Sequence, residues 1–138
     1  MTILVEKHPF LSISFMYDFL VGDVLYKSVE HYYLANKYIN SELQNKIGSA
    51  PTLNLARYYS STTRQNGDLL TLDGNNLRSD WGEQKVSIML DGVRYKFKNE
   101  ILRGRLLKLG NSQFESKRTP WLARILNIVR EEIKIGIN

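Results

Sequence analysis

The chain has 138 residues, of which 43% are hydrophobic and 24% charged, a usage that fits a globular domain and excludes a disordered or fibrous protein. No apolar run approaches the roughly 18 residues of a membrane-spanning helix, and the first residues lack the pattern of a secretory signal. We therefore expect one cytoplasmic domain over residues 1–138. Because there is no cysteine, disulfides, thiol nucleophiles and thiolate zinc sites are excluded. The net charge of +5 favours a polyanionic partner or a phosphate-bearing ligand, without choosing between them.

The N-terminal segment is rich in β-branched and aromatic residues. Three stretches are typical of strands: residues 3–5, 10–15 and 24–26. Gly22 and Asp23 lie between two apolar stretches, where a tight turn favours glycine. The pattern predicts a small N-terminal sheet or hairpin.

A helical period begins at Ser28, a good N-cap residue. One apolar stripe at three- and four-residue spacing predicts a single helix as far as Gly48, and its members are Tyr32, Ala35, Ile39, Leu43 and Ile47. A shorter helix is predicted over residues 53–59. Residues 60–79 are polar and contain the turn pairs Asn66-Gly67 and Asp73-Gly74, which predicts a loop or a small hairpin around residues 69–72.

The C-terminal half is predicted to be helical. Asp80 and Glu83 resemble a capping box at the start of a segment over residues 81–109, with bends near Gly92 and near Asn99 or Gly104. Thr119 and Pro120 begin a last helix, whose predicted buried face is Leu122, Ile125, Leu126, Val129 and Ile133. The fold class that follows is mainly α, an α+β domain with a minor N-terminal β element.

Familiar metal and nucleotide motifs are absent, and we expect neither a metal nor a cofactor. His8 and His31 have no partner at a metal-ligand spacing, and neither a P-loop nor a GxGxxG motif occurs. Glu30 falls in the first turn of its predicted helix, where the helix dipole stabilises a carboxylate. Lys37 follows about two turns later on the same face. The pair indicates either a solvated helix face or one wall of a ligand cleft.

Trp81 and Lys85 are one helical turn apart and can share a face, an arrangement that suits stacking of a base or sugar beside a cation. The alternative is a core tryptophan next to a surface lysine. Six basic residues and one acidic residue lie between positions 94 and 108, with Tyr95 and Phe97 among them. This run predicts a phosphate-binding surface that would suit nucleic acid, although such charges also serve solubility and Phe97 fits a core position.

Several short segments resemble one family when they are taken in order. They are Phe10-Leu11-Ser12, the run Tyr26 to Tyr33 followed by Lys37, Trp81 with Lys85 and Met89, Lys96-Phe97 with Asn99, and Leu106-Leu107. Together they resemble the NADAR family, which includes riboflavin-intermediate N-glycosidases. The resemblance extends from about Phe10 to Arg130, and its most specific piece is the segment Ser28 to Tyr33 with the downstream lysine.

The resemblance implies a compact multihelical domain that hydrolyses an N-glycosidic bond at a phosphorylated ribose. The implied catalytic residues are Glu30, Lys37 and Lys85, with Glu30 as the essential carboxylate and a lysine, Lys37 before Lys85, as a candidate for an imine with ring-opened ribose. The implied substrate-binding residues are Ser12, Tyr33, Trp81, Lys96 and Trp121. Removal of ADP-ribose from guanine bases of DNA is the expected reaction. The alternatives are phosphoribosylamino intermediates of riboflavin synthesis and a binding module without catalysis.

The chain departs from the family pattern in two places. Ile13 follows Leu11-Ser12 where the family carries Asn, and the Asp and glycine-rich loop that precede the last family helix are missing. Trp121 either replaces the tryptophan of that loop or simply begins the helix. The short loop would suit a compact viral version that acts in the host cytoplasm.

Overall fold

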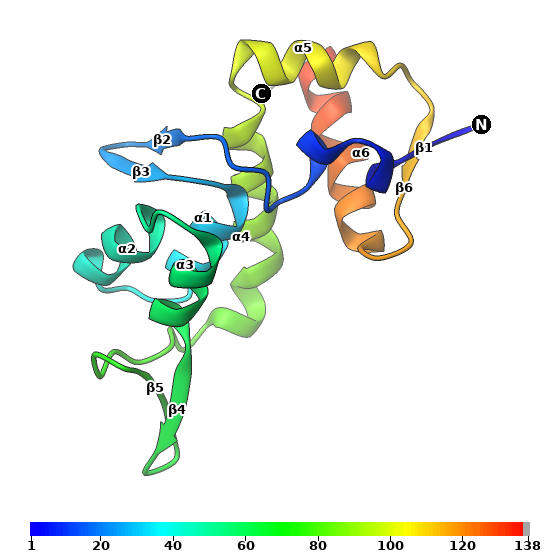
Figure 1. Cartoon of the computed structure of the whole chain (residues 1–138). Coiled ribbons are helices and arrows are strands. Elements are labelled where there is room, and N and C mark those ends of the chain that lie inside the picture. The colour runs from blue at the N-terminus through cyan, green and yellow to red at the C-terminus, as the bar shows by residue number, and fades with distance from the viewer. Residues whose placement is uncertain (137–138) are drawn as a thin grey trace.

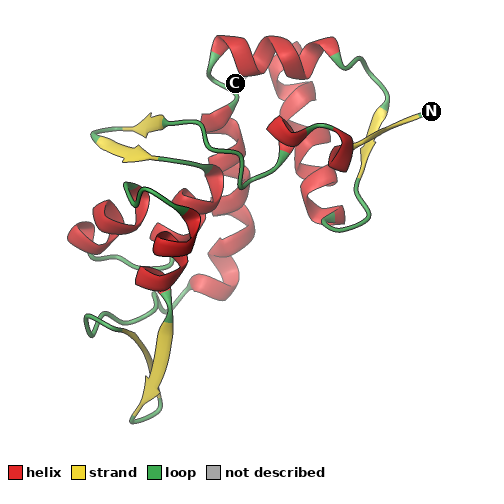
Figure 2. Cartoon of the chain, in the orientation of Figure 1, coloured by secondary structure: helices red, strands yellow, loops and turns green. Residues whose placement is uncertain are grey.

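The computed structural model describes residues 1–136, and helices dominate it (Figures 1 and 2). The helices in this part of the chain are α1 (Val29–Ala35), α2 (Ser41–Gly48), α3 (Leu53–Ser60), α4 (Trp81–Lys96), α5 (Glu100–Lys108) and α6 (Pro120–Lys134). Short 3₁₀ turns cover Val5–Lys7 and Pro9–Leu11. The strands are β1 (Thr2–Leu4), β2 (Phe19–Val21), β3 (Val24–Tyr26), β4 (Thr62–Gln65), β5 (Asp68–Thr71) and β6 (Gln113–Glu115). The predicted mainly helical class with a minor β component is confirmed.

Within residues 1–136, the strands form three two-stranded sheets. The predicted N-terminal hairpin is present as β2 and β3, with Gly22 in its turn at φ +61°. The hairpin predicted around residues 69–72 is β4 and β5, whose turn residues Asn66 and Gly67 both have positive φ. β1 instead pairs in parallel with β6, so that Ile3 lies opposite Phe114. These two strands are far apart in the sequence and become neighbours only in the folded chain.

The strand predicted over residues 10–15 is wrong. Pro9 begins a 3₁₀ turn that ends at Leu11, and turns follow. Both Phe10 and Leu11 are buried, so their apolar character reflects core packing rather than a strand. The turn brings Ile13 close to the start of α1, where its carbonyl accepts a hydrogen bond from the Glu30 N–H at 3.0 Å.

The single helix predicted over residues 28–47 is also wrong, because two asparagines divide it. α1 ends at Ala35, and the Asn36 side chain donates to the Tyr32 carbonyl at 2.7 Å. Asn40 then caps α2, since its side-chain oxygen accepts from the Leu43 N–H at 2.9 Å. The apolar stripe was therefore a correct indication of burial for four of its five members, but Ile39 lies between the helices and is 77% exposed.

α4 is the central element, and α1 to α3 and α6 lie on different sides of it (Figure 1). The bend predicted at Gly92 does not occur, since α4 continues to Lys96. Gly92 instead lets α1 pack closely: a Cβ there would come within 3.0 Å of the Tyr32 ring and 3.1 Å of Val29. The predicted break near Asn99 is confirmed, because its side chain caps α5. Gly104 lies within α5 without interrupting it.

Two apolar clusters lie on either side of α4. One joins α4, α5 and α6 to the N-terminal segment and β6, and the other joins α1, α2 and α3 to the β2–β3 hairpin. In α6 the predicted face is buried at Leu122, Ile125, Leu126 and Val129, while Ile133 is partly buried. Within residues 1–136, no helix has both the length and the apolar character needed to cross a membrane.

Candidate active site

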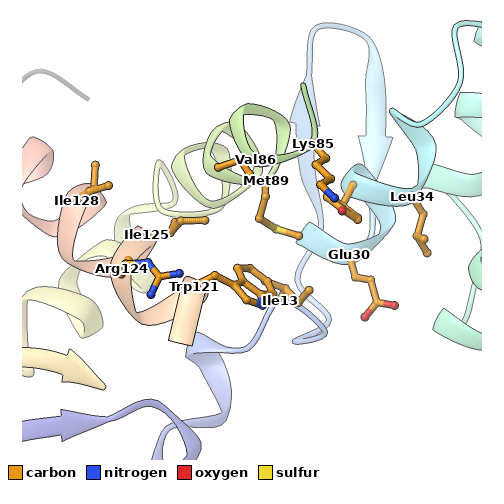
Figure 3. A pocket seen from close by; sticks show the side chains of 11 residues that line it. Ile13, Glu30, Leu34, Lys85, Val86, Met89, Trp121, Arg124, Ile125 and Ile128 are labelled. Atoms are coloured by element: carbon orange, nitrogen blue, oxygen red, sulfur yellow. The ribbon is translucent and has the colours of Figure 1, made fainter. Parts of the chain in front are cut away.

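A cavity of about 770 Å³ lies between α1, α4 and α6 (Figure 3). This volume is in the range of small-molecule sites. The side chains that line it come from three helices and one turn: Ile13, Glu30, Tyr33, Leu34, Lys85, Val86, Met89, Trp121, Arg124, Ile125 and Ile128. Most of the lining is apolar, and the charged groups Glu30, Lys85 and Arg124 come from different helices. Four of the eight predicted site residues line this cavity, namely Glu30, Tyr33, Lys85 and Trp121, and the other four do not, namely Ser12, Lys37, Trp81 and Lys96.

Glu30 is placed at the cavity by the start of α1. Ser28 caps the helix, and its hydroxyl accepts from the His31 N–H at 3.1 Å. The Glu30 side chain is 14% exposed. Its carboxylate accepts two hydrogen bonds from one guanidinium, at 2.6 Å from Arg57 Nε and 2.9 Å from Arg57 Nη2. The ion pair raises the pKa of Arg57, chiefly through these hydrogen bonds.

Arg57 is a charged group beside the cavity that the sequence analysis did not name, and Arg124, which lines the cavity, is another. Arg57 lies on α3, 27 residues after Glu30, and its side chain is 53% exposed. No spacing in the sequence indicates the contact, because α3 reaches α1 only after the chain has passed through α2. The nearest signal was the helix predicted over residues 53–59, which contains Arg57 but does not say which way it faces.

Aromatic side chains form two walls of the cavity. Tyr33 projects from α1, and burial raises the pKa of its phenol. Its ring meets the indole of Trp81 edge to face, with the centroids 4.9 Å apart. Trp81 is partly buried and is not among the lining residues. On the other side, Trp121 occupies the second position of α6 and lines the cavity. Its replacement of the family's loop tryptophan stays a prediction.

The two candidate lysines are in different environments. Lys85 is exposed on α4 and lines the cavity. Lys37 follows the end of α1, so the predicted two-turn helical spacing from Glu30 is wrong. Its side chain is half-buried, its pKa is lowered by burial, and it is not among the lining residues. Its main-chain carbonyl accepts from the Arg78 N–H at 2.8 Å, which joins the end of α1 to the segment before α4.

Lys96 and Ser12 are not among the residues that line the cavity. Lys96 is 4% exposed, and its Nζ donates to the main-chain carbonyls of Phe10 and Ser12. Burial lowers the pKa of Lys96 to about 7. The Ser12 and Ser14 hydroxyls are hydrogen-bonded at 2.8 Å. These contacts fix the turn that carries Ile13 to the cavity and to the Glu30 N–H.

The basic run over residues 94–108 does not present all its charges to solvent. Arg94 forms two hydrogen bonds with Glu132, at 2.9 and 2.7 Å, and one with Asp91. Lys96 is buried, and so is Phe97, as its core reading predicted. Lys98 and Lys108 are exposed.

His31, 0% exposed, is hydrogen-bonded between Ser28 and the Ala50 carbonyl, and burial lowers its pKa.

Comparisons with known proteins give a sequence match to a curated protein and a structural match that bears on the fold. No family model matches the chain. A riboflavin biosynthesis protein of Vibrio vulnificus is 29% identical over 148 aligned positions that include 94% of this chain, but the chain spans only 36% of that relative's length. The NMR structure of the E. coli protein YbiA matches with a TM-score of 0.71 at 19% identity, over 92% of this chain and 79% of that one. The chain is therefore similar in sequence to part of a riboflavin biosynthesis protein, and it shares the fold of YbiA.

Proposed function

We propose that the chain is an N-glycosidase that hydrolyses the bond between C1 of a phosphorylated ribose and a nitrogen of a base or amine. The observation that carries the proposal is the Glu30 carboxylate on the wall of a cavity that also has aromatic and cationic side chains. A flat base fits against Tyr33 or Trp121. Lys85 and Arg124 supply charge for phosphate groups.

The proposed reaction breaks the C1–N bond, and the electron pair leaves with the nitrogen, which takes a proton. A water oxygen bonds to C1 and loses a proton. Glu30 would accept that proton or stabilise the positive charge that develops at C1. In a second route the ribose ring opens. A lysine amine then displaces the nitrogen of the base or amine from C1 and forms an imine with C1, and water hydrolyses this imine. Lys85 is supported for this role by its place in the cavity lining, and Lys37 by its lowered pKa.

For the substrate we propose ADP-ribose attached to guanine in DNA, because the net charge of +5 suits a polyanion. A second candidate is a phosphoribosylamino-pyrimidine of riboflavin synthesis, which the name of the Vibrio vulnificus relative favours. The experiment incubates the purified chain with an oligonucleotide that carries ADP-ribosyl-guanine and, separately, with the phosphoribosylamino-pyrimidine. Release of ADP-ribose, or of ribose 5-phosphate, is followed by mass spectrometry. Tight binding of the oligonucleotide with no release from either compound would instead indicate a binding module.

A further inference from the structure

The Glu30–Arg57 ion pair engages both oxygens of the proposed catalytic carboxylate. Both oxygens accept from the same guanidinium, at 2.6 and 2.9 Å. The positive charge of the guanidinium offsets the negative charge of the carboxylate beside it. The full charge of Glu30 acts on the substrate only when Arg57 is drawn away.

Arg57 is built to move in this way. Among residues 1–136, Glu30 is the only partner of its guanidinium. The neighbouring Ala56 is 0% exposed, so the backbone of α3 is held in place while the long Arg57 side chain, 53% exposed, extends into solvent. The Glu30 side chain is only 14% exposed and its contact with Arg57 is bidentate, so a competing anion must offer the guanidinium an equally good geometry.

The competing anion is a phosphate. A guanidinium binds phosphate oxygens with the same two-pronged geometry that it uses for a carboxylate. Lys85 and Arg124 line the cavity together with Glu30, so the cavity attracts an anionic ligand. Figure 3 shows the Glu30 carboxylate directed away from α4 and α6, at the edge of the group of lining side chains.

We infer that Arg57 recognises a phosphate group on the substrate and, by exchanging its ion pair with Glu30 for one with the phosphate, frees the carboxylate. The inference rests on the proposed function and makes the reaction selective for substrates that carry a phosphate group. A ribosyl compound without phosphate would leave Arg57 on Glu30 and the carboxylate blocked. Arg57 is thus a specificity-determining residue that contacts the part of the substrate remote from the reacting bond.

The first test measures binding without turnover, using ribose 5-phosphate and ribose as probes. Calorimetry is expected to show that ribose 5-phosphate binds at least about tenfold more tightly than ribose, as a charge-assisted phosphate contact provides. The variant Arg57→Gln should lose this preference, and the matched variant Arg64→Gln, an exposed arginine of β4, should retain it. Equal affinity for the two sugars in the unmodified chain, or a preference unchanged in Arg57→Gln, would overturn the inference.

The second test follows the exchange of partners directly. The side-chain N–H signal of Arg57 is assigned by nitrogen-15 NMR from its loss in Arg57→Gln, and Glu30→Gln shows where it moves when the carboxylate is removed. Ribose 5-phosphate should move this signal in the unmodified chain, and ribose should not. A signal that stays in place while calorimetry shows ribose 5-phosphate bound would mean that Arg57 remains on Glu30, which contradicts the inference.

A kinetic comparison separates this inference from the proposed function. Arg57→Gln should raise kcat on the dephosphorylated ribosylamino-pyrimidine, because Glu30 is no longer blocked, and should raise KM for the phosphorylated compound, because its phosphate loses a contact. A purely structural role for Arg57 predicts instead a similar loss of kcat on both compounds. If the NMR signal moves as expected but neither compound is hydrolysed, the proposed function fails and the phosphate contact stands.

Discussion

Tyr33 and Trp81 hold the start of α4 against α1, with the edge of one ring on the face of the other and their centroids 4.9 Å apart. Tyr33 lines the cavity, whereas Trp81 lies behind it. The tryptophan that resembles a family site residue therefore supports an aromatic wall, and any contact that it makes with a ligand comes in addition to this role. Edge-to-face pairs of this kind add about 0.5–1.5 kcal/mol beyond the area they bury.

Replacement of Trp81 tests the supporting role. Trp81→Ala should lower the free energy of unfolding by roughly 1–3 kcal/mol, less than the loss at a fully buried aromatic, and should weaken ligand binding because Tyr33 loses its support. Trp81→Phe should retain most of both. Urea unfolding and calorimetry with ribose 5-phosphate provide the measurements. Loss of binding in Trp81→Phe at unchanged stability would show that the indole itself stacks on the ligand.

The buried Lys96 should make stability depend on pH. Its pKa is about 7 in the folded chain and 10.5 when exposed. Between these values the unfolded chain binds more protons, so the free energy of unfolding rises with pH from about 7 to about 10.5. Urea unfolding across this range should show a steeper rise for the unmodified chain than for Lys96→Met. The exposed Lys98→Met is the control and should leave the slope unchanged; equal slopes in all three would contradict the account.

The position of the reactive lysine can be found by chemical trapping. If ribose opens during turnover, borohydride reduces the imine to a stable adduct, which peptide mass spectrometry locates. Because Lys85 lines the cavity and Lys37 does not, the adduct is expected on Lys85 and should disappear in Lys85→Gln but persist in Lys37→Gln. An adduct on Lys37 would show that the cavity rearranges, and an active enzyme without any adduct would favour direct attack by water.

The paired and buried members of the basic run should contribute little to nucleic-acid binding. Lys108 is exposed, so Lys108→Gln should reduce the slope of log affinity against log salt by about 1. Arg94→Gln should change this slope less and instead lower the free energy of unfolding by about 1 kcal/mol, because Arg94 is bound to Glu132 and Asp91. Fluorescence anisotropy with a DNA oligonucleotide at several salt concentrations distinguishes the two. A larger change of slope for Arg94→Gln would contradict the assignment.

The sequence predicted correctly those elements that are marked by capping or turn residues of their own. Ser28, Asn66-Gly67 and Pro120 mark a helix start, a turn and a helix start, and each occurs where expected. Two of the failures have a common cause, because burial resembles secondary structure in the sequence. Phe10 and Leu11 are apolar because they pack in the core, and the stripe from Tyr32 to Ile47 runs through two helices that share one cluster.

Site residues that lie within the family-like segments could be predicted from the sequence. Residues that reach the site from a distant part of the chain could not. Glu30, Tyr33, Lys85 and Trp121 were expected from the family resemblance, and all line the cavity. Whether they act as the resemblance implies stays a prediction. Arg57 could not be found, because its contact with Glu30 depends on how α3 is placed by the chain between them. The pairing of β1 with β6, 111 positions apart along the chain, was invisible for the same reason.

The most direct measurement compares Glu30→Gln with Glu42→Gln, an exposed glutamate on α2, in the rate of N-glycosidic bond hydrolysis. The amide keeps the size of the side chain but removes its charge and its capacity to accept a proton. Glu30→Gln is expected to lose at least about a hundredfold in kcat, with the circular dichroism of the folded chain retained, and Glu42→Gln is expected to be unaffected. Turnover by Glu30→Gln at the rate of the unmodified chain would contradict the account.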